Sequence, residues 1–140
     1  MNRVVLTEVT TAPLDVAAHE TAVADPRAGA VVSFAGVVRD HDHGRSVSTL
    51  TYESHPSAAE VLREVAEELA ADPDVYAIAV SHRYGPLAIG DVALAAAVST
   101  AHRAAAFTVC ARLVDLVKQR LPIWKHQVFT DGTDEWVNCP

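Results

Sequence analysis

The order of strands and helices expected along the chain is the feature that most limits its fold. Short stretches rich in β-branched or alternating apolar residues predict strands, whereas apolar residues three and four apart predict helices. Several of the expected strands follow one another without an intervening helix, which disfavours a doubly wound parallel sheet. An α+β sandwich with a mixed or largely antiparallel sheet is predicted instead. The patterns place strands at residues 4–9, 29–38, 47–54, 75–85, 91–100, 123–130 and 135–138, and helices at residues 13–24, 56–69 and 101–121.

The size and composition of the chain fit a single globular unit. Its 140 residues contain no internal repeat and no linker, so one domain covering residues 1–140 is expected. Half of the residues are apolar, which is enough for a hydrophobic core. The formal net charge of −7 argues against general binding to nucleic acid or to anionic membranes.

The sequence predicts a cytoplasmic location. The first residues lack the apolar core of a signal peptide, and Asp91 interrupts the longest apolar run. Two cysteines without a CxxC motif are expected to be reduced thiols. Cys110 is predicted to lie in the core, and Cys139 is predicted to have no function near the end of the chain.

The longest predicted helix covers residues 101–121. Ser99 or Thr100 is expected to cap its start, and Pro122 is expected to end it because the residue before a proline resists the helical conformation. Apolar residues recur along the helix at spacings of three and four. They predict one buried stripe of Phe107, Cys110, Val114, Val117 and Leu121.

Both lysines of the chain lie around the end of this helix. Lys118 and Lys125 are seven residues apart, and a reversal at Pro122 could bring them together. Lysines that share a pocket can exchange protons or act as nucleophiles. The favourable interaction of a cation with a helix carboxyl end is a sufficient alternative explanation for Lys118 alone.

A second group of basic residues opens the same helix. His102 and Arg103 lie in its first turn, where free N–H groups favour an anion such as phosphate. An exposed arginine with a simple surface contact is the alternative. Sixteen residues separate His102 from Lys118, or about 24 Å along a helix, which is too far for one small-molecule pocket. We therefore expect that a site using both ends takes residues from two copies of the chain.

The polar stretch at residues 39–46 is predicted to be a loop. It contains Arg39, His41, Asp42 and His43, and Arg39 is a candidate contact for an anion. A His-x-His pair with one aspartate is weak evidence for a metal, since no third ligand follows at a typical spacing. His55 and His82 are expected to be structural.

Four segments, taken together and in this order, resemble the catalytic (large) subunit of molybdopterin synthase. They are "GAVVSFAGVVRDHDHG", "SHRYGPLAIGD", "VSTAHRAAAF" and "VDLVKQRLPIWKHQ" with a later Gly and Trp-Val, and they extend from Gly29 to Val137. The resemblance implies an α/β hammerhead fold with an added small antiparallel sheet. It also implies a sulfurtransferase of molybdenum cofactor biosynthesis, which converts cyclic pyranopterin monophosphate to the dithiolene of molybdopterin.

The resemblance also implies the partners of the chain. Sulfur is supplied as a thiocarboxylate on the C-terminal Gly-Gly of a small ubiquitin-like subunit, whose tail enters a pocket of the large subunit. Two large subunits form a central dimer with one small subunit at each end, which makes a heterotetramer. Neither a metal nor another cofactor is required for this step.

The residues of the implied site follow from the matching positions. Lys118 and Lys125 correspond to the essential lysines of the family, and the His102–Arg103 pair is supplied by the neighbouring large subunit. The chain differs from the family where Val37 replaces a frequent lysine, and its end at Pro140 is shorter. Substrate contacts are expected from Arg39, His102, Arg103, His126, Gln127 and the backbone at Val37 and Val38.

Two other function classes remain open at this point. A non-catalytic oligomeric module that binds a phosphorylated ligand would keep Arg39 and Arg103 but would not need both lysines. A metal-dependent hydrolase would need the "HDHG" segment as its metal site.

Overall fold

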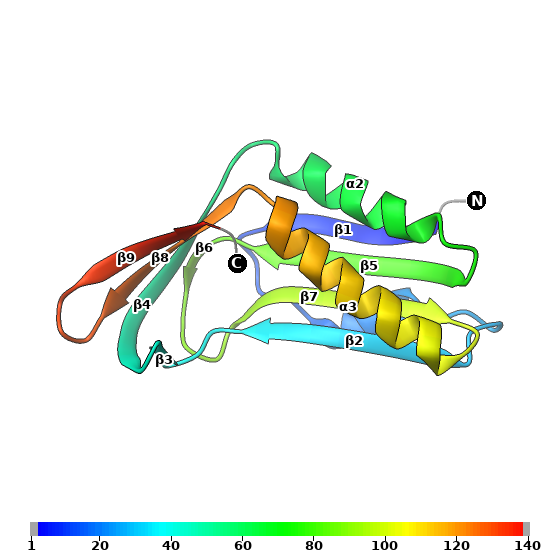
Figure 1. Ribbon diagram of the computed structural model, residues 1–140, viewed down its shortest axis with the longest axis horizontal. Coiled ribbons are helices and arrows are strands. Elements are labelled where there is room, and N and C mark those ends of the chain that lie inside the picture. Colours follow the sequence, from blue (N-terminus) through cyan, green and yellow to red (C-terminus); the bar gives the residue numbers. More distant parts are fainter. Residues whose placement is uncertain (1–2, 139–140) are drawn as a thin grey trace.

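A four-stranded mixed sheet forms the larger part of the molecule in the computed structural model, which describes residues 3–138 (Figure 1). Strand β1 runs parallel to β5, whereas β5 and β2 are both antiparallel to β7. The mixed sheet predicted from the sequence is therefore confirmed. Its strands lie in the order β1 (Val4–Thr10), β5 (Val75–Arg83), β7 (Val92–Thr100) and β2 (Ala30–Val37).

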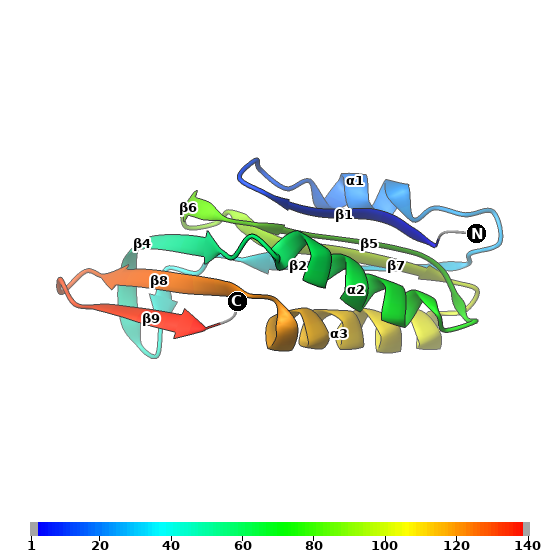
Figure 2. The ribbon, with the colours of Figure 1, turned by 90° about the horizontal axis from the view of Figure 1, so that it is seen from above.

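Helices cover both faces of this sheet (Figure 2). The short helix α1 (Val16–Ala22) lies on one face, and α2 (Ala58–Ala70) and α3 (Arg103–Arg120) lie on the other. Residues of α2 and α3 that are spaced three and four apart point to the sheet, as amphipathic helices require. The main core between these layers includes Leu62, Val65, Ile78, Val98, Leu113 and Val117.

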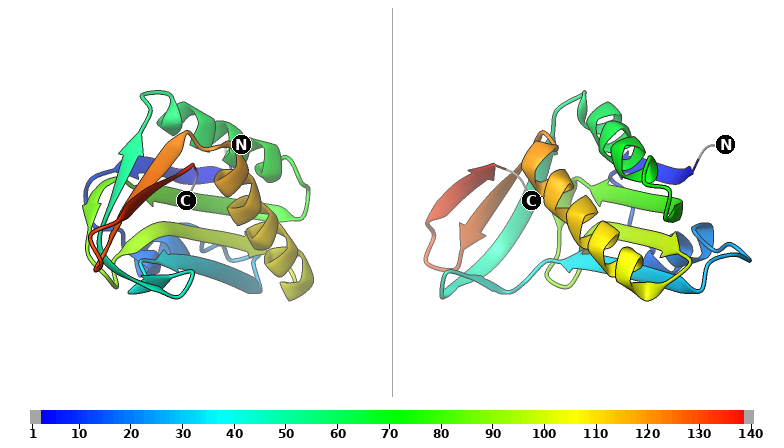
Figure 3. Two further views of the ribbon diagram at one scale, coloured as in Figure 1. Left: turned by 60° about the vertical axis from the view of Figure 1, so that its left-hand side comes forward. Right: turned by 45° about the vertical axis from the view of Figure 1, so that its right-hand side comes forward.

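A second, antiparallel sheet stands at one end of the first (Figures 1 and 3). It contains, in order, β3 (His41–Asp42), β4 (Arg45–Ser54), β8 (Ile123–Phe129) and β9 (Asp134–Asn138), and β6 (Gly85–Leu87) also pairs with β4. Figure 3 shows that its strands run at an angle to those of the first sheet. The added small antiparallel sheet that the family resemblance implied is therefore present.

The predicted loop at residues 39–46 is instead part of a β-hairpin. His41 and Asp42 pair with Ser46 and Arg45, and the turn between them is formed by His43 and Gly44. Both turn residues have positive φ angles, 51° and 76°, as tight hairpin turns with right-handed strand twist require. The sequence concealed this short pairing, because β3 has only two residues and the part of β4 that pairs with it is polar.

The long helix differs from its prediction in two respects. Ser99 and Thr100 belong to β7, and His102 occupies the N-cap position without a side-chain hydrogen bond, so the predicted cap is wrong. Phe107 is 62% exposed, so its assignment to the buried stripe is also wrong. The other four members of the stripe are buried, and Leu121 is already extended before Pro122.

The cysteine predictions are only partly tested by the structure. Cys110 is a buried free thiol of α3, and its burial raises the pKa of the thiol. Cys139 lies outside the described residues. Within residues 3–138, no helix has the length and apolar character that crossing a membrane requires.

Candidate active site

A polar pocket lies where the two sheets meet. The end of β2 and the residues that follow it form one wall, and the inner faces of β3, β4 and β8 form the others. Val38 is held in place by two backbone bonds, from its N–H to Asp91 O (2.9 Å) and from the Gly90 N–H to its own carbonyl (2.8 Å). The lining residues are Val37, Val38, Arg39, His41, Asp42, Leu50, Tyr52, Lys125 and Gln127.

Asp42 is the fixed negative charge of this pocket. The buried Gln127 amide donates to Asp42 Oδ2 over 2.7 Å and to Glu135 Oε1 over 2.9 Å. The bond from Gln127 is the main reason why the pKa of the Asp42 carboxyl lies below its ordinary value, and the charges of Lys125, His43 and Arg39 act in the same direction.

Positive charge exceeds negative charge among the lining residues. Arg39 pairs with Asp42 at 3.4 Å, yet its side chain remains 66% exposed. Lys125 adds a second cation beside the same carboxylate. A guanidinium has five N–H donors and an ammonium has three, so one carboxylate leaves donors available for a ligand. This pocket is suited to a small anion.

Tyr52 and His82 connect this pocket with Lys118. Tyr52 is directly opposite Lys125 in the β4–β8 pair, and its ring meets the His82 ring edge-on at 5.1 Å between centroids. His82 is fully buried, and its burial is the main cause that lowers its pKa to about 4. The charge of Lys118, in the exposed last turn of α3, contributes to the same lowering.

The two residues after Lys125 project from opposite faces of β8. Gln127 lines the pocket together with Lys125, as the two-residue period of a strand requires. His126 lies on the other face, where it stacks on Trp136 at 4.4 Å and pairs with Asp134 at 2.8 Å. The pocket therefore brings together Arg39, Val37, Val38, Lys125 and Gln127, but not His126.

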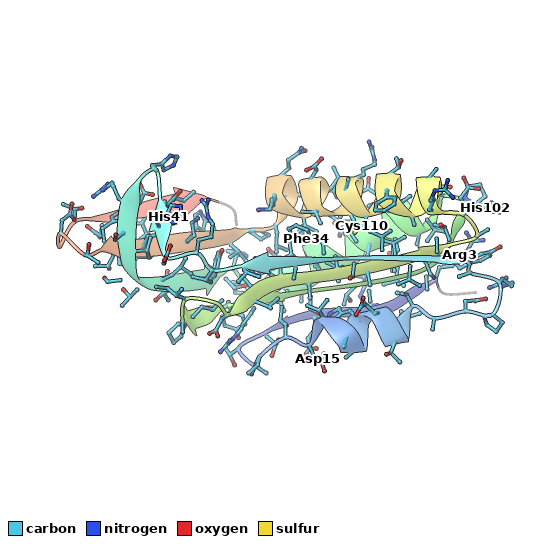
Figure 4. All side chains as sticks on the ribbon, turned by 90° about the horizontal axis from the view of Figure 1, so that it is seen from below. Arg3, Asp15, Phe34, His41, His102 and Cys110 are labelled. Atoms are coloured by element: carbon cyan, nitrogen blue, oxygen red, sulfur yellow. The ribbon has the colours of Figure 1, made fainter. Side chains whose placement is uncertain are left out.

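His102 and Arg103 are far from this pocket within one chain. Figure 4 shows His41 of the pocket and His102 at opposite ends of the molecule. Helix α3 has 18 residues and separates the two regions by about 27 Å along its axis. A different pocket, formed by residues around Tyr76 and Ala101, borders His102. The chain by itself does not assemble all the predicted site residues.

An apolar groove lies between β2 and α3. Phe34 of β2 and Cys110 of α3, which Figure 4 labels, both line it, and the exposed Phe107 is a further lining residue. Exposed aromatic side chains beside an apolar groove are typical of protein interfaces. The groove residues on α3 extend from Phe107 to Asp115, so the groove is centred near the middle of that helix.

The histidine-rich hairpin does not form a metal-binding cluster. His41 contacts the neighbouring Asp40 at 2.7 Å, and His43 lies 3.6 Å from Asp42. Across residues 3–138, no group of three His, Cys, Asp or Glu side chains is arranged to hold a metal ion. The hydrolase interpretation therefore has no site in the described part of the chain.

Sequence reasoning missed Tyr52 and His82 as neighbours of the lysines. A histidine in the predicted strand "VYAIAVSHRYG", close after the apolar run "AIAV", was the available signal, because fully buried polar side chains require a partner. Tyr52 carried no such signal, since aromatic residues are common in strands.

Comparisons with known proteins agree on one family. The family described as MoaE protein matches residues 9–120. Molybdopterin synthase catalytic subunit 1 of Mycobacterium tuberculosis is 38% identical over 130 residues, which cover 92% of this chain and 88% of that relative. The molybdopterin synthase catalytic subunit of Arabidopsis thaliana is 38% identical over 120 residues, or 85% of this chain, and the match spans 61% of that relative's length.

A solved structure agrees with these sequence matches. The X-ray crystal structure of molybdopterin synthase from Staphylococcus aureus superimposes with a TM-score of 0.85 at 30% identity. The match covers 93% of this chain and 95% of that one.

Proposed function

The chain belongs to the MoaE protein family, and we propose that it is the catalytic subunit of a molybdopterin synthase. In this reaction, sulfur passes from the C-terminal thiocarboxylate of a small ubiquitin-like subunit to cyclic pyranopterin monophosphate. The product is the dithiolene of molybdopterin. The observation that carries the proposal is the polar pocket that holds Arg39 and Lys125.

The charge of the pocket suits the substrate of this reaction. Phosphate and pterin oxygens need N–H donors and positive charge, which Arg39 and Lys125 supply. The Asp42 carboxylate partly neutralises this positive charge. It is held in place by its hydrogen bond from Gln127, a buried residue of β8. Val37 stands where many family members have a lysine. Its apolar side chain is 49% exposed and lines the pocket.

The two lysines have different roles in the proposed mechanism. Lys125 holds the substrate and stabilises negative charge that develops on it. Lys118 acts beside the thiocarboxylate, where sulfur attack and later hydrolysis of the acyl intermediate both require proton transfer. Tyr52 is opposite Lys125 and contacts His82, and the charge of Lys118 acts on His82. This chain of neighbours supports a single site with one lysine at each end.

A second copy of the chain completes this site. In a symmetric dimer the same surface serves both copies. A two-fold axis that runs perpendicular to α3 and passes the apolar groove near Ala111 makes the two α3 helices antiparallel. His102 and Arg103 of one copy then lie near Lys118 of the other. The length of α3 and the central position of the groove support this arrangement.

Reconstitution tests the proposed function. The purified chain is mixed with a thiocarboxylated small subunit and cyclic pyranopterin monophosphate, and molybdopterin is measured by conversion to a fluorescent derivative. We expect product from the native chain and loss of product from Lys118→Ala and Lys125→Ala. Arg63→Ala, on the exposed face of α2, is the control for removal of a helical cation. Product formation that survives in both lysine variants would refute the assignment.

A further inference from the structure

Among the described residues, one ring nitrogen of His82 has no hydrogen-bond partner. Its side chain is fully buried on β5, and Nδ1 lies 2.7 Å from the Arg83 carbonyl oxygen. A carbonyl oxygen can only accept, so Nδ1 carries the hydrogen and Nε2 presents its lone pair. Nε2 makes no hydrogen bond within the described residues, although buried polar atoms nearly always have a partner.

A second buried histidine shows how the fold satisfies a purely structural ring. His19 of α1 uses both nitrogens, Nδ1 with the Asp15 carbonyl and Nε2 with the Ser81 hydroxyl, each at 2.7 Å. Ser81 and His82 are adjacent on β5, so their side chains point to opposite faces of the sheet. The ring whose Nε2 lacks a partner in the described part of the chain is therefore the one on the α2–α3 side.

One group of the proposed site contacts the His82 ring, and a second acts on it through its charge. Tyr52 meets it edge-on at 5.1 Å with an interplanar angle of 81°. The charge of Lys118 acts on it from the last turn of α3. A lysine ammonium has three donors and no acceptor, and it is carried on a flexible four-carbon chain. It is therefore a suitable hydrogen-bond donor to the lone pair of His82 Nε2.

We propose that His82 is a positioning residue that accepts a hydrogen bond at Nε2 from the Lys118 ammonium and holds it beside Tyr52. The inference rests on the proposed function of Lys118. Because burial lowers the pKa of His82 to about 4, the ring is neutral at neutral pH. It therefore orients the lysine and does not store a proton.

Nuclear magnetic resonance tests the contact without any enzymatic assay. The full-length chain, labelled with ¹⁵N-histidine, is compared with its Lys118→Met variant. In the variant, we expect the ¹⁵N chemical shift of His82 Nε2 to move toward the value of an imidazole nitrogen that accepts no hydrogen bond. The ¹⁵N chemical shift of His19 Nε2 should stay constant. A His82 Nε2 shift that is the same in both proteins would overturn the proposal, since a bound water or another group would then occupy the site.

Activity of the reconstituted enzyme gives the second readout. His82→Gln places an amide oxygen near the position of Nε2, whereas His82→Met has a similar size and no acceptor there. We expect His82→Met to lower kcat on the order of ten- to hundredfold with KM for the pterin unchanged, the effect of one hydrogen bond to a charged group. His82→Gln should recover most of the rate, and His19→Gln should keep it.

The outcomes separate the two proposals. Equal rates for His82→Met and the native chain would overturn the role of His82, and so would equal loss in His82→Met and His82→Gln. A native chain that makes no molybdopterin would refute the proposed function. The His82 Nε2 shift would still report the contact with Lys118 in that case.

Discussion

Tyr52 faces Lys125 across the β4–β8 pair, and its ring meets that of His82 in the other sheet in a T-shaped arrangement. One aromatic side chain therefore borders both the polar pocket and the core of the larger sheet. The proposed site depends on the junction of the two sheets, because β2 and β5 belong to one of them and β4 and β8 to the other. Any change that shifts one sheet against the other is expected to alter the distance between the lysines.

Arg39 is predicted to act in substrate binding rather than in stability. Its guanidinium is mostly exposed, and exposed ion pairs contribute little to folding. Arg39→Ala should therefore leave Tm nearly unchanged but raise KM for the pterin by about tenfold or more, because a charged hydrogen bond to the substrate is lost. Steady-state kinetics and thermal denaturation measure the two effects.

Arg27→Ala is the matched control for this change. Arg27 also pairs with a nearby aspartate, Asp25 at 2.8 Å, but it is not among the residues that line the pocket. A similar rise of KM in both variants would contradict a specific role for Arg39.

Hybrid dimers test whether two chains share each site. Lys118→Ala and Arg103→Ala chains are each expected to be inactive alone. After unfolding and refolding together, half of the dimers are hybrids, and each hybrid has one site with both residues intact. We expect recovery of about a quarter of the native activity in the reconstitution assay. A mixture that remains as inactive as its components would show that one chain supplies both residues.

Phe107 is predicted to be an anchor of the dimer. Burial of a charge in an apolar interface is strongly unfavourable, so Phe107→Asp should convert the dimer to a monomer. Analytical ultracentrifugation measures the mass directly. Ile89→Asp is the control, because Ile89 is a similarly exposed apolar residue (52%) outside the groove. Dissociation by both substitutions, or by neither, would contradict an interface at the groove.

His82 should make stability fall with acidification. The unfolded chain binds a proton at this residue below its ordinary pKa of 6.5, whereas the folded ring stays neutral down to about pH 4. The free energy of unfolding should therefore decrease as the pH falls from 6.5 to about 4, by about 3 kcal/mol from this residue. Urea denaturation across this range should show a flatter profile for His82→Gln.

Ser99→Ala is the control for the acid profile. Ser99 carries the other buried side-chain atom without a hydrogen bond in the described part of the chain, and its hydroxyl does not titrate. Its removal should shift the whole curve without changing the slope. A native slope in His82→Gln would mean that this residue is not the source of the pH dependence.

The long elements of the fold were predictable because their patterns are strong. The β-branched stretch of β2, the apolar run of β7 and the periodicity of α2 each extend over several residues. Strand β6 was missed because it has only three residues and contains Gly85 and Pro86, which normally break a strand. Its pairing with Leu50 and Tyr52 is imposed by tertiary structure.

The site was predictable only in part, for a similar reason. Lys118, Lys125 and Arg39 stood out by charge and by family resemblance, and the length of α3 indicated a second chain. Periodicity shows which residues of a helix share a face, but not how far the buried face extends, so Phe107 was misplaced. The contact between Tyr52 and His82 joins residues thirty positions apart, which local patterns do not report.

The two lysines have a consequence for the chemical selectivity of the molecule. Apart from the amino terminus, Lys118 and Lys125 carry every primary amine of the chain, and arginine supplies the other fixed cations. A guanidinium stays protonated and is a poor nucleophile toward acyl groups. If the small subunit delivers an activated acyl tail, the rest of this surface offers it no lysine amine to acylate by mistake.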